Sequence, residues 1–280
     1  MTTLTSRALL GLGTAAGLVL ALGACGAGEV DKAGGSSASA SKSPTGAASA
    51  EAPGVKTVTE GWLKVCTNPP YAPFEDTDGD QVIGFDMDLT SEVAKDLGLE
   101  IEFVVVGFES IESGASLDTD ACDIGASALT ITEDRLAKLD FSDPYYETTM
   151  GLLVKAESGI SSLADLEGKA VGVQQGTTGE DWANAQPELT EIRQYEGLGD
   201  QVTALKAGDV AGIFNDEPTL TPYEDEGFKV VSSFATGETF GFAVKKGNAE
   251  LLAQINTTLA RLQADGSYDG LLAKWFADQE

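Results

Sequence analysis

Residues 59–280 alternate short β-like runs with amphipathic helical stretches. The stretch at residues 87–97 shows the helical pattern: an apolar side chain recurs at every fourth position, Asp86 can cap the first turn, and Gly98 ends the helix. Further helices are predicted from Thr178, at 201–207, from Pro218, at 251–262 and at 271–276. Strands are predicted at 63–66, 101–106, 123–128, 170–173, 191–193 and 211–214. Such repeated strand–helix–strand units indicate an α/β protein with mostly parallel sheets and helices on both faces.

Two extended segments, residues 145–154 and 239–244, separate these units into two series. Two crossings between lobes make the first lobe discontinuous. Lobe 1 is therefore predicted to comprise residues 59–147 and 245–280, and lobe 2 residues 148–244. Strands of both lobes would then end at one cleft, where a ligand is expected.

The first 58 residues predict export. Residues 1–25 read as a signal peptide, with Arg7 before a short apolar stretch. They end in Leu22-Gly23-Ala24-Cys25, which resembles the lipobox of bacterial lipoproteins, where the cysteine takes the lipid. An ordinary signal peptide with an incidental cysteine is the alternative. Residues 26–58 are rich in Gly, Ala, Ser and Thr without an apolar period, so we expect a flexible tether. Anchor and tether place the folded body on the extracytoplasmic face of the bacterial cell membrane.

Charge and composition exclude several function classes. The chain has 45 acidic and 17 basic residues, a formal net charge of −28, which argues against nucleic-acid binding. The absence of histidine excludes Ser-His-Asp catalysis and His-ligated zinc sites, and no metal or cofactor is expected. Cys66 and Cys122 are an even pair in an oxidising compartment and can form a disulfide. Two separate buried thiols are the alternative.

Two segments combine hydroxyls and backbone N–H groups in a way that suits an anion. Residues 130–135 follow a strand and include Arg135, which can bind a carboxylate through two parallel hydrogen bonds. The alternative is a capping Thr132 and a surface arginine paired with an acid. Residues 174–179 form a second such loop in the other lobe, without the lysine of a phosphate-binding P-loop. A tight strand-to-helix turn is the alternative there.

Other side chains at strand ends are candidates for ligand contact. Asp216 ends a strand of lobe 2 and can receive an ammonium group, although capping the following helix is the commoner use. Tyr71, Phe74 and Phe108 follow strands of lobe 1 and can sandwich a ligand side chain or belong to the core. Residues 76–80 lack the spacing of glycine and glutamate in a calcium-binding EF-hand loop, so an Asp-Gly turn between two short strands is predicted instead.

In combination these segments resemble the family-3 extracellular solute-binding proteins, the polar amino-acid receptors of ABC importers. The resemblance is carried by residues 63–75, 84–89, 130–135, 140–146 and 172–178. It implies a two-lobe fold of the periplasmic-binding-protein type II (Venus flytrap) with two crossover strands, and no enzymatic activity. It also implies a function: a lipid-anchored monomer captures an amino acid by lobe closure and delivers it to an ABC permease.

Matching positions imply how the ligand is held. The implied contacts of the α-carboxylate are Arg135, Thr130 and the backbone at Thr177 and Thr178. Those of the α-ammonium are Asp216 and the Ala128 carbonyl. Those of the side chain are the rings of Tyr71 and Phe108 with Asn68, Ser127 and Gln174 at the far end.

One departure bears on the ligand. Asn68 stands where receptors for basic amino acids in this family usually have a carboxylate, which favours an amide or another uncharged polar side chain. Two alternative functions remain open at this point. One is a small-acid dehydratase or lyase on the same scaffold, with Glu217 as general acid. The other is a ligand-sensing partner of a membrane receptor.

Overall fold

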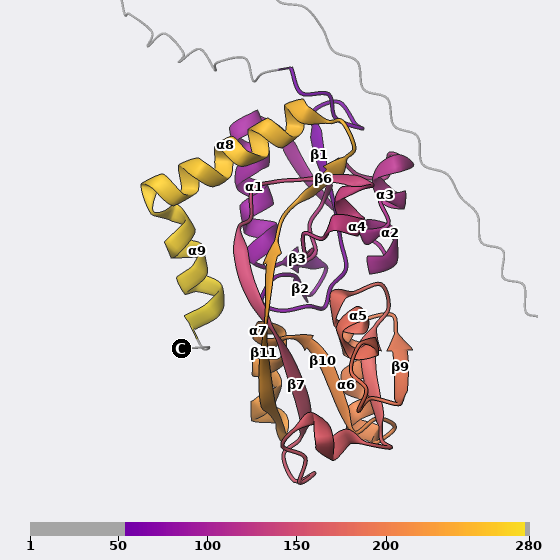
Figure 1. Ribbon diagram of the computed structural model, residues 1–280. Helices are drawn as coiled ribbons and strands as arrows, with labels where there is room; N and C mark the ends of the chain where they lie inside the picture. Colours follow the sequence, from indigo (N-terminus) through magenta and orange to yellow (C-terminus); the bar gives the residue numbers. More distant parts are fainter. Residues whose placement is uncertain (1–53, 278–280) are drawn as a thin grey trace, which may run out of the picture. The chain divides into compact units, whose positions relative to one another are not determined.

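The computed structural model describes residues 54–277, which contain two five-stranded sheets (Figure 1). The first sheet has the order β4-β1-β5-β12-β6. Its strands are β1 (Trp62–Thr67), β4 (Glu100–Val105), β5 (Ile124–Gly125), β6 (Leu139–Phe141) and β12 (Ala243–Lys245). The second sheet has the order β11-β7-β10-β8-β9. Its strands are β7 (Tyr146–Lys155), β8 (Ala170–Gln174), β9 (Glu191–Tyr195), β10 (Gly212–Asp216) and β11 (Phe228–Phe240).

The chain passes between the sheets twice. It leaves the first sheet after β6 and enters the second as β7, and it returns from β11 to β12. β7 and β11 run antiparallel beside each other, from Tyr146 opposite Phe240 to Lys155 opposite Phe228 (Figure 1). The predicted two-lobe α/β architecture with two crossover strands is therefore present.

The prediction of mostly parallel sheets is wrong. β1 pairs in parallel with β4 and β5, and β8 pairs in parallel with β9 and β10. All pairs that involve β6, β7, β11 or β12 are antiparallel. These are the strands that flank the two crossings, and strand direction there depends on how the chain returns between sheets rather than on local sequence.

Helices pack beside each sheet. The longer helices near the first sheet are α1 (Phe85–Leu97), α8 (Ala249–Asp265) and α9 (Ser267–Phe276). Those near the second are α5 (Thr178–Asn184) and α6 (Leu198–Ala207). Short helices are α2 (Phe108–Glu112), α3 (Ala115–Asp118), α4 (Glu133–Leu136), α7 (Glu217–Leu220) and the 3-10 helices η1 (Leu163–Leu166) and η2 (Thr221–Glu226). The predicted Asp-Gly turn is confirmed: it joins β2 (Asp76–Asp78) to β3 (Gln81–Ile83).

The start of α1 differs from the prediction and matters for the site. Gly84, not Asp86, is the N-cap, and a Cβ at Gly84 would lie 2.0 Å from the Phe74 carbonyl oxygen. Asp86 is fully buried in the first turn, where its carboxylate accepts hydrogen bonds from the Ala128 N–H (2.9 Å) and the Tyr145 hydroxyl (2.8 Å). Ala128 has a φ of 44°, a strained value for a residue with a side chain. Asp86 therefore stabilises an unusual backbone turn beside the candidate site.

A disulfide joins Cys66 of β1 to Cys122, with 5.7 Å between the two Cα atoms.

Residues 54–58, assigned above to the tether, lie against the folded unit: Val55 packs on the core and the Val58 N–H donates to Asp123 Oδ1 at 2.6 Å. Cys25, the proposed signal peptide and tether residues 26–53 lie outside the described residues. Within residues 54–277 no helix has the length and apolarity of a membrane span.

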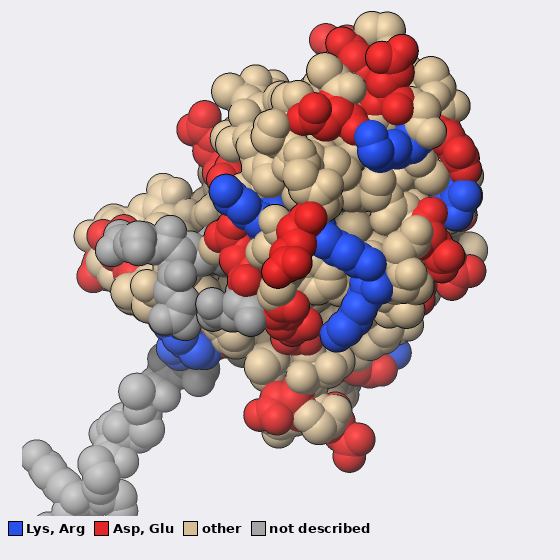
Figure 2. All heavy atoms as spheres, turned by 90° about the horizontal axis from the view of Figure 1, so that it is seen from below, with Lys and Arg blue, Asp and Glu red and all other residues tan. Residues whose placement is uncertain are grey.

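Acidic and basic side chains are interspersed on the surface. On the face seen in Figure 2, acidic side chains are spread widely and basic side chains lie between them. Nine ion pairs are formed within the described residues, among them those of Arg261 with Glu92 and Asp96. This face therefore does not present a continuous basic surface.

Candidate functional site

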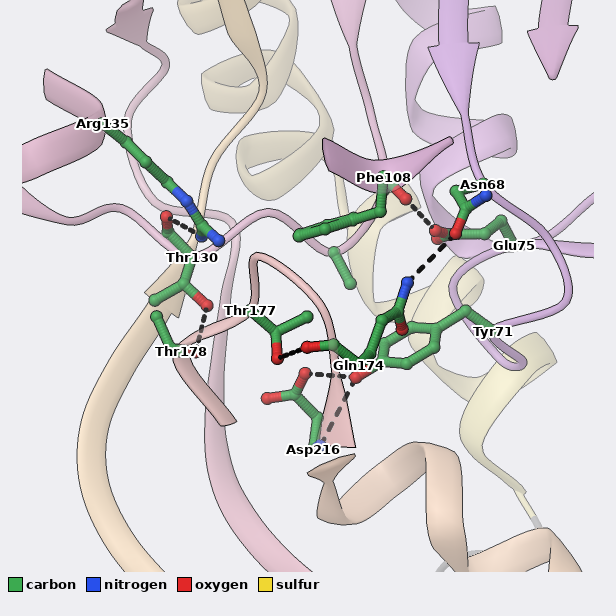
Figure 3. Close-up of a pocket in the computed structure, with 12 residues that line it drawn as sticks. Asn68, Tyr71, Glu75, Phe108, Thr130, Arg135, Gln174, Thr177, Thr178 and Asp216 are labelled. Carbon is green, nitrogen blue, oxygen red and sulfur yellow. Dashed lines mark hydrogen bonds between the residues drawn. The ribbon is translucent and has the colours of Figure 1, made fainter. Parts of the chain in front are cut away.

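A cavity lies where strands of both sheets end (Figure 3). Its lining comprises Asn68, Tyr71, Glu75, Phe108, Ser127, Ala128, Thr130, Arg135, Gln174, Thr177, Thr178 and Asp216. These side chains follow the carboxyl ends of β1, β4, β5, β8 and β10, the usual place for a ligand in sheets of this kind. The structure thus brings together all eleven residues predicted from the sequence to contact a ligand, and adds Glu75.

Arg135 points into the cavity rather than to the surface. Thr132 caps α4 by accepting the Arg135 N–H at 3.2 Å, as the alternative interpretation required. The arginine side chain, however, is only 5% exposed, and its guanidinium donates to the Thr130 carbonyl (2.8 Å) and the Gly176 carbonyl (3.0 Å). No ion pair of Arg135 occurs within residues 54–277. The interpretation as a surface arginine paired with an acid is wrong.

Burial of this guanidinium is unfavourable without an anion. Desolvation lowers the pKa of Arg135, and the nearby Glu112 carboxylate partly offsets that effect. The Phe108 ring lies 5.5 Å from the guanidinium carbon, which gives a cation–π contact but no charge neutralisation. A buried cation of this kind is stabilised when a carboxylate enters the cavity.

The loop at residues 174–179 forms the opposite wall. The Thr177 hydroxyl donates to the Gln174 carbonyl at 2.7 Å and caps α5 by accepting the Glu180 N–H at 3.1 Å. The Gly176 N–H already donates to the Glu180 carboxylate at 2.9 Å, so this donor is occupied. Thr178 lies across the cavity from Thr130, with 3.4 Å between their hydroxyl oxygens. The loop therefore contributes hydroxyls, carbonyls and only part of the free N–H groups expected of it.

Asp216 ends β10 and occupies the N-cap position of α7, but its side chain makes no capping hydrogen bond. Its Oδ2 accepts a hydrogen bond of 2.6 Å from the Tyr71 hydroxyl, whereas its buried Oδ1 has no hydrogen-bond partner among residues 54–277. Burial raises the pKa of Asp216 to about 7, and the Glu238 charge adds to this rise. The hydrogen bond from Tyr71, the nearby Thr148 hydroxyl and the charge of Arg135 oppose it. The capping interpretation is wrong, and an unpaired carboxylate oxygen remains available.

Polar side chains form the far end of the cavity. Gln174 Nε2 donates to Asn68 Oδ1 at 3.1 Å, and Asn68 Nδ2 donates to the Val106 carbonyl at 2.8 Å. The Ser127 hydroxyl donates to Glu75 Oε1, while Glu75 Oε2 is buried and has no partner in the part of the chain that the structure describes. Burial, together with the negative charge of Asp86, raises the pKa of Glu75 well above its ordinary value.

Sequence reasoning missed Glu75 as a site residue. The signal was present, since Glu75 ends the segment 63–75 that carries the family resemblance. A glutamate after a proline-rich turn is ordinarily exposed, however, and this one is fully buried. Only the fold places its carboxylate in the cavity.

Two further candidates lie elsewhere. Phe74 is fully buried and packs edge-on against Tyr146 and Phe240, with ring centroids 5.0 and 5.1 Å away. It is therefore a core residue. Glu217, the candidate general acid, does not line the cavity: its carboxylate accepts hydrogen bonds from the Thr149 and Ser233 hydroxyls beside a separate groove.

Comparison with known proteins identifies relatives of this chain. The family model of bacterial extracellular solute-binding proteins, family 3, matches residues 63–278. The histidine-binding periplasmic protein of Salmonella typhimurium is 32% identical over 228 residues, covering 76% of this chain and 87% of that protein.

Solved structures show the same fold. An ancestral arginine-binding protein bound to glutamine is 36% identical with a TM-score of 0.73, covering 78% of this chain and 99% of that one. The substrate binding protein of an amino acid ABC transporter is 30% identical, also with a TM-score of 0.73, covering 78% and 100%. With the two sheets and two crossings, these likenesses confirm the type II periplasmic-binding-protein fold.

Proposed function

Because the chain belongs to the bacterial extracellular solute-binding proteins, family 3, we propose that it is the amino-acid-binding subunit of an ABC importer. It captures its ligand outside the cytoplasm by closing two lobes and delivers it to a membrane permease. The relatives named above are amino-acid-binding proteins and a transporter subunit, which supports this proposal.

One observation carries the proposal: the cavity holds two unmatched groups of opposite charge. Within residues 54–277, the buried guanidinium of Arg135 donates hydrogen bonds to two carbonyl oxygens and has no carboxylate partner, and one buried oxygen of Asp216 has no donor. Burying either charge alone is costly. An α-amino acid carries a carboxylate and an ammonium group on one carbon, so it can satisfy both groups at once. A ligand with only one of the two charges would leave the other protein group unpaired.

The other lining residues have assigned roles in this proposal. Thr130 and the backbone at Thr177 and Thr178 assist Arg135 at the α-carboxylate, and the Ala128 carbonyl accepts from the α-ammonium. The rings of Tyr71 and Phe108, both less than 10% exposed, enclose the ligand side chain. Ser127, Asn68 and Gln174 contact its polar end.

The preferred ligand side chain is polar and uncharged, with an amide as the best match. Asn68 and Gln174 offer amide groups. Burial and the negative charge of Asp86 raise the pKa of Glu75 well above its ordinary value, which favours the neutral carboxyl group, able both to donate and to accept a hydrogen bond. A cationic side chain would instead require ionised Glu75. Replacement of Glu75 by glutamine distinguishes the two cases.

An enzymatic role has less support. Glu217 lies outside the cavity, and the relatives described above are named as binding proteins. Recovery of the ligand unchanged after prolonged incubation with the protein is the expected result.

The protein acts outside the cytoplasm as a monomer anchored by lipid at Cys25, within the segment Leu22-Gly23-Ala24-Cys25. Metabolic labelling with palmitate should mark the wild-type protein and not Cys25→Ala. Labelling of both proteins would contradict the anchor. Light scattering of the purified protein should give one chain per particle.

The function is tested by a thermal-shift screen of the purified protein against the twenty amino acids, cystine and opines. A ligand at a hundred times its Kd stabilises a protein by about 2.7 kcal/mol. In a chain of this size that raises Tm by roughly 5–10 °C. If none of these compounds raises Tm, the proposed function is wrong.

A further inference from the structure

Tyr71 connects the two halves of the cavity through its hydroxyl group. It belongs to the turn after β1, where its N–H donates to the Glu75 carbonyl at 2.6 Å and its own carbonyl accepts the Phe74 and Glu75 N–H groups. These three hydrogen bonds fix the backbone of Tyr71 within the first lobe. Its hydroxyl nevertheless reaches β10 of the second lobe and donates to Asp216 Oδ2 at 2.6 Å (Figure 3).

The contact occupies one oxygen of the Asp216 carboxylate and leaves the other unpaired. The Asp216 N–H also lies 3.4 Å from the Tyr71 hydroxyl oxygen, and Asn215 Oδ1 lies at the same distance. The hydroxyl is therefore held by several groups of β10, and Asp216 Oδ1 keeps a defined direction while no donor within the described residues 54–277 occupies it. This hydrogen bond requires both lobes, since its donor follows β1 and its acceptor ends β10.

We propose that the Tyr71 hydroxyl is a positioning group, which orients Asp216 toward the ligand ammonium only when the lobes are closed. The inference rests on the proposed function and adds a second role for Tyr71, whose ring is assigned there to the ligand side chain. In the open protein Asp216 loses this donor. The ammonium group is therefore bound well only in the closed state, and its binding prolongs the lifetime of that state.

Tyr71→Phe tests the inference because it keeps the ring and removes the hydroxyl. Hydrogen bonds to charged groups are the stronger ones, so ligand dissociation should accelerate roughly 10- to 100-fold. The association rate should stay within about twofold of wild type, since the contact forms after the ligand has entered. Both rates are measured by stopped-flow fluorescence. Tyr268→Phe is the matched control, because it removes a hydroxyl that donates to the Tyr145 carbonyl away from the cavity; it should leave both rates unchanged.

A second readout separates positioning of Asp216 from general packing. The probes are L-glutamine and glutaramate, the same molecule without its α-ammonium group. If another amino acid raises the wild-type Tm further, that amino acid and its des-amino counterpart replace them. Tyr71→Phe should weaken binding of the amino acid and hardly affect binding of the des-amino compound. The ratio of the two affinities should therefore fall roughly 10- to 100-fold.

The outcomes are distinct. An equal loss for both probes assigns Tyr71 to packing alone, and unchanged or tighter binding of the amino acid shows that the hydroxyl is dispensable or competes with the ammonium group. Either result overturns the inference while leaving the proposed function intact. Failure of the wild-type protein to bind any amino acid would instead refute the proposed function, and the inference with it.

Discussion

Replacement of Arg135 by alanine tests the charge complementarity of the cavity. The guanidinium is 5% exposed and within residues 54–277 has no carboxylate partner, and its two hydrogen bonds go to the Thr130 and Gly176 carbonyls. In the complex, the ligand α-carboxylate would be its counter-ion. The variant would leave that carboxylate buried and unpaired.

The magnitude follows from the cost of breaking a buried pair, about 3–5 kcal/mol. At about 1.4 kcal/mol per tenfold, affinity should fall roughly 150- to 4000-fold. Stability of the unliganded protein should respond differently. Removal of the guanidinium costs two hydrogen bonds but also relieves a desolvated charge, so the two effects nearly cancel. We expect a change in unfolding free energy of no more than about 1 kcal/mol, a Tm shift of roughly 2–4 °C.

Titration calorimetry gives the affinity and differential scanning calorimetry gives the Tm of the ligand-free protein. Arg193→Ala is the matched control, because Arg193 is an exposed arginine paired with Glu191. It should change neither quantity measurably. Unchanged affinity in Arg135→Ala would refute the assignment. A large loss of Tm without ligand would show that Arg135 serves the fold rather than the ligand.

Three further predictions follow from the site and its surroundings. Burial raises the pKa of Asp216 to about 7, and a bound ammonium group would lower it, so ligand binding below pH 7 releases a proton. Ligand affinity measured by calorimetry should therefore rise roughly 100-fold from pH 5 to pH 7 and then level off, and a flat profile would contradict this. Glu75→Gln should change affinity less than about fivefold if the ligand side chain is uncharged, whereas a loss of a hundredfold or more in calorimetry would identify a cationic ligand. Replacing Cys66 and Cys122 together by serine removes the disulfide, whose two cysteines are 56 residues apart in the sequence. The free energy of unfolding measured in urea should therefore fall by about 4 kcal/mol while ligand affinity stays unchanged, and an unaltered urea midpoint would contradict this.

The sequence predicted where the site lies because its residues follow strand ends. Residues such as Asn68, Gln174 and Asp216 come directly after apolar runs, and the fold brings such positions to one cleft. The family resemblance then separated these residues from equally polar residues elsewhere. The local pattern alone favoured an exposed side chain for Arg135 and a capping side chain for Asp216. In the structure Arg135 is buried, and the Asp216 side chain makes no capping hydrogen bond.

What the sequence could not show depends on tertiary contacts. The sequence pattern favours Asp86 as a helix cap, yet the partners of its carboxylate are the Ala128 N–H and the Tyr145 hydroxyl, 42 and 59 residues away. Glu75 is buried by the same fold. The direction of β7 and β12 likewise depends on the crossings between sheets, which no local pattern encodes.

The most direct test is a crystal structure with the amino acid that gives the largest thermal shift. We expect the ligand carboxylate within hydrogen-bonding distance of both terminal nitrogens of Arg135 and the ligand ammonium group within hydrogen-bonding distance of Asp216 Oδ1. A ligand bound outside this cavity, or one with its charged ends contacting neither residue, would contradict it.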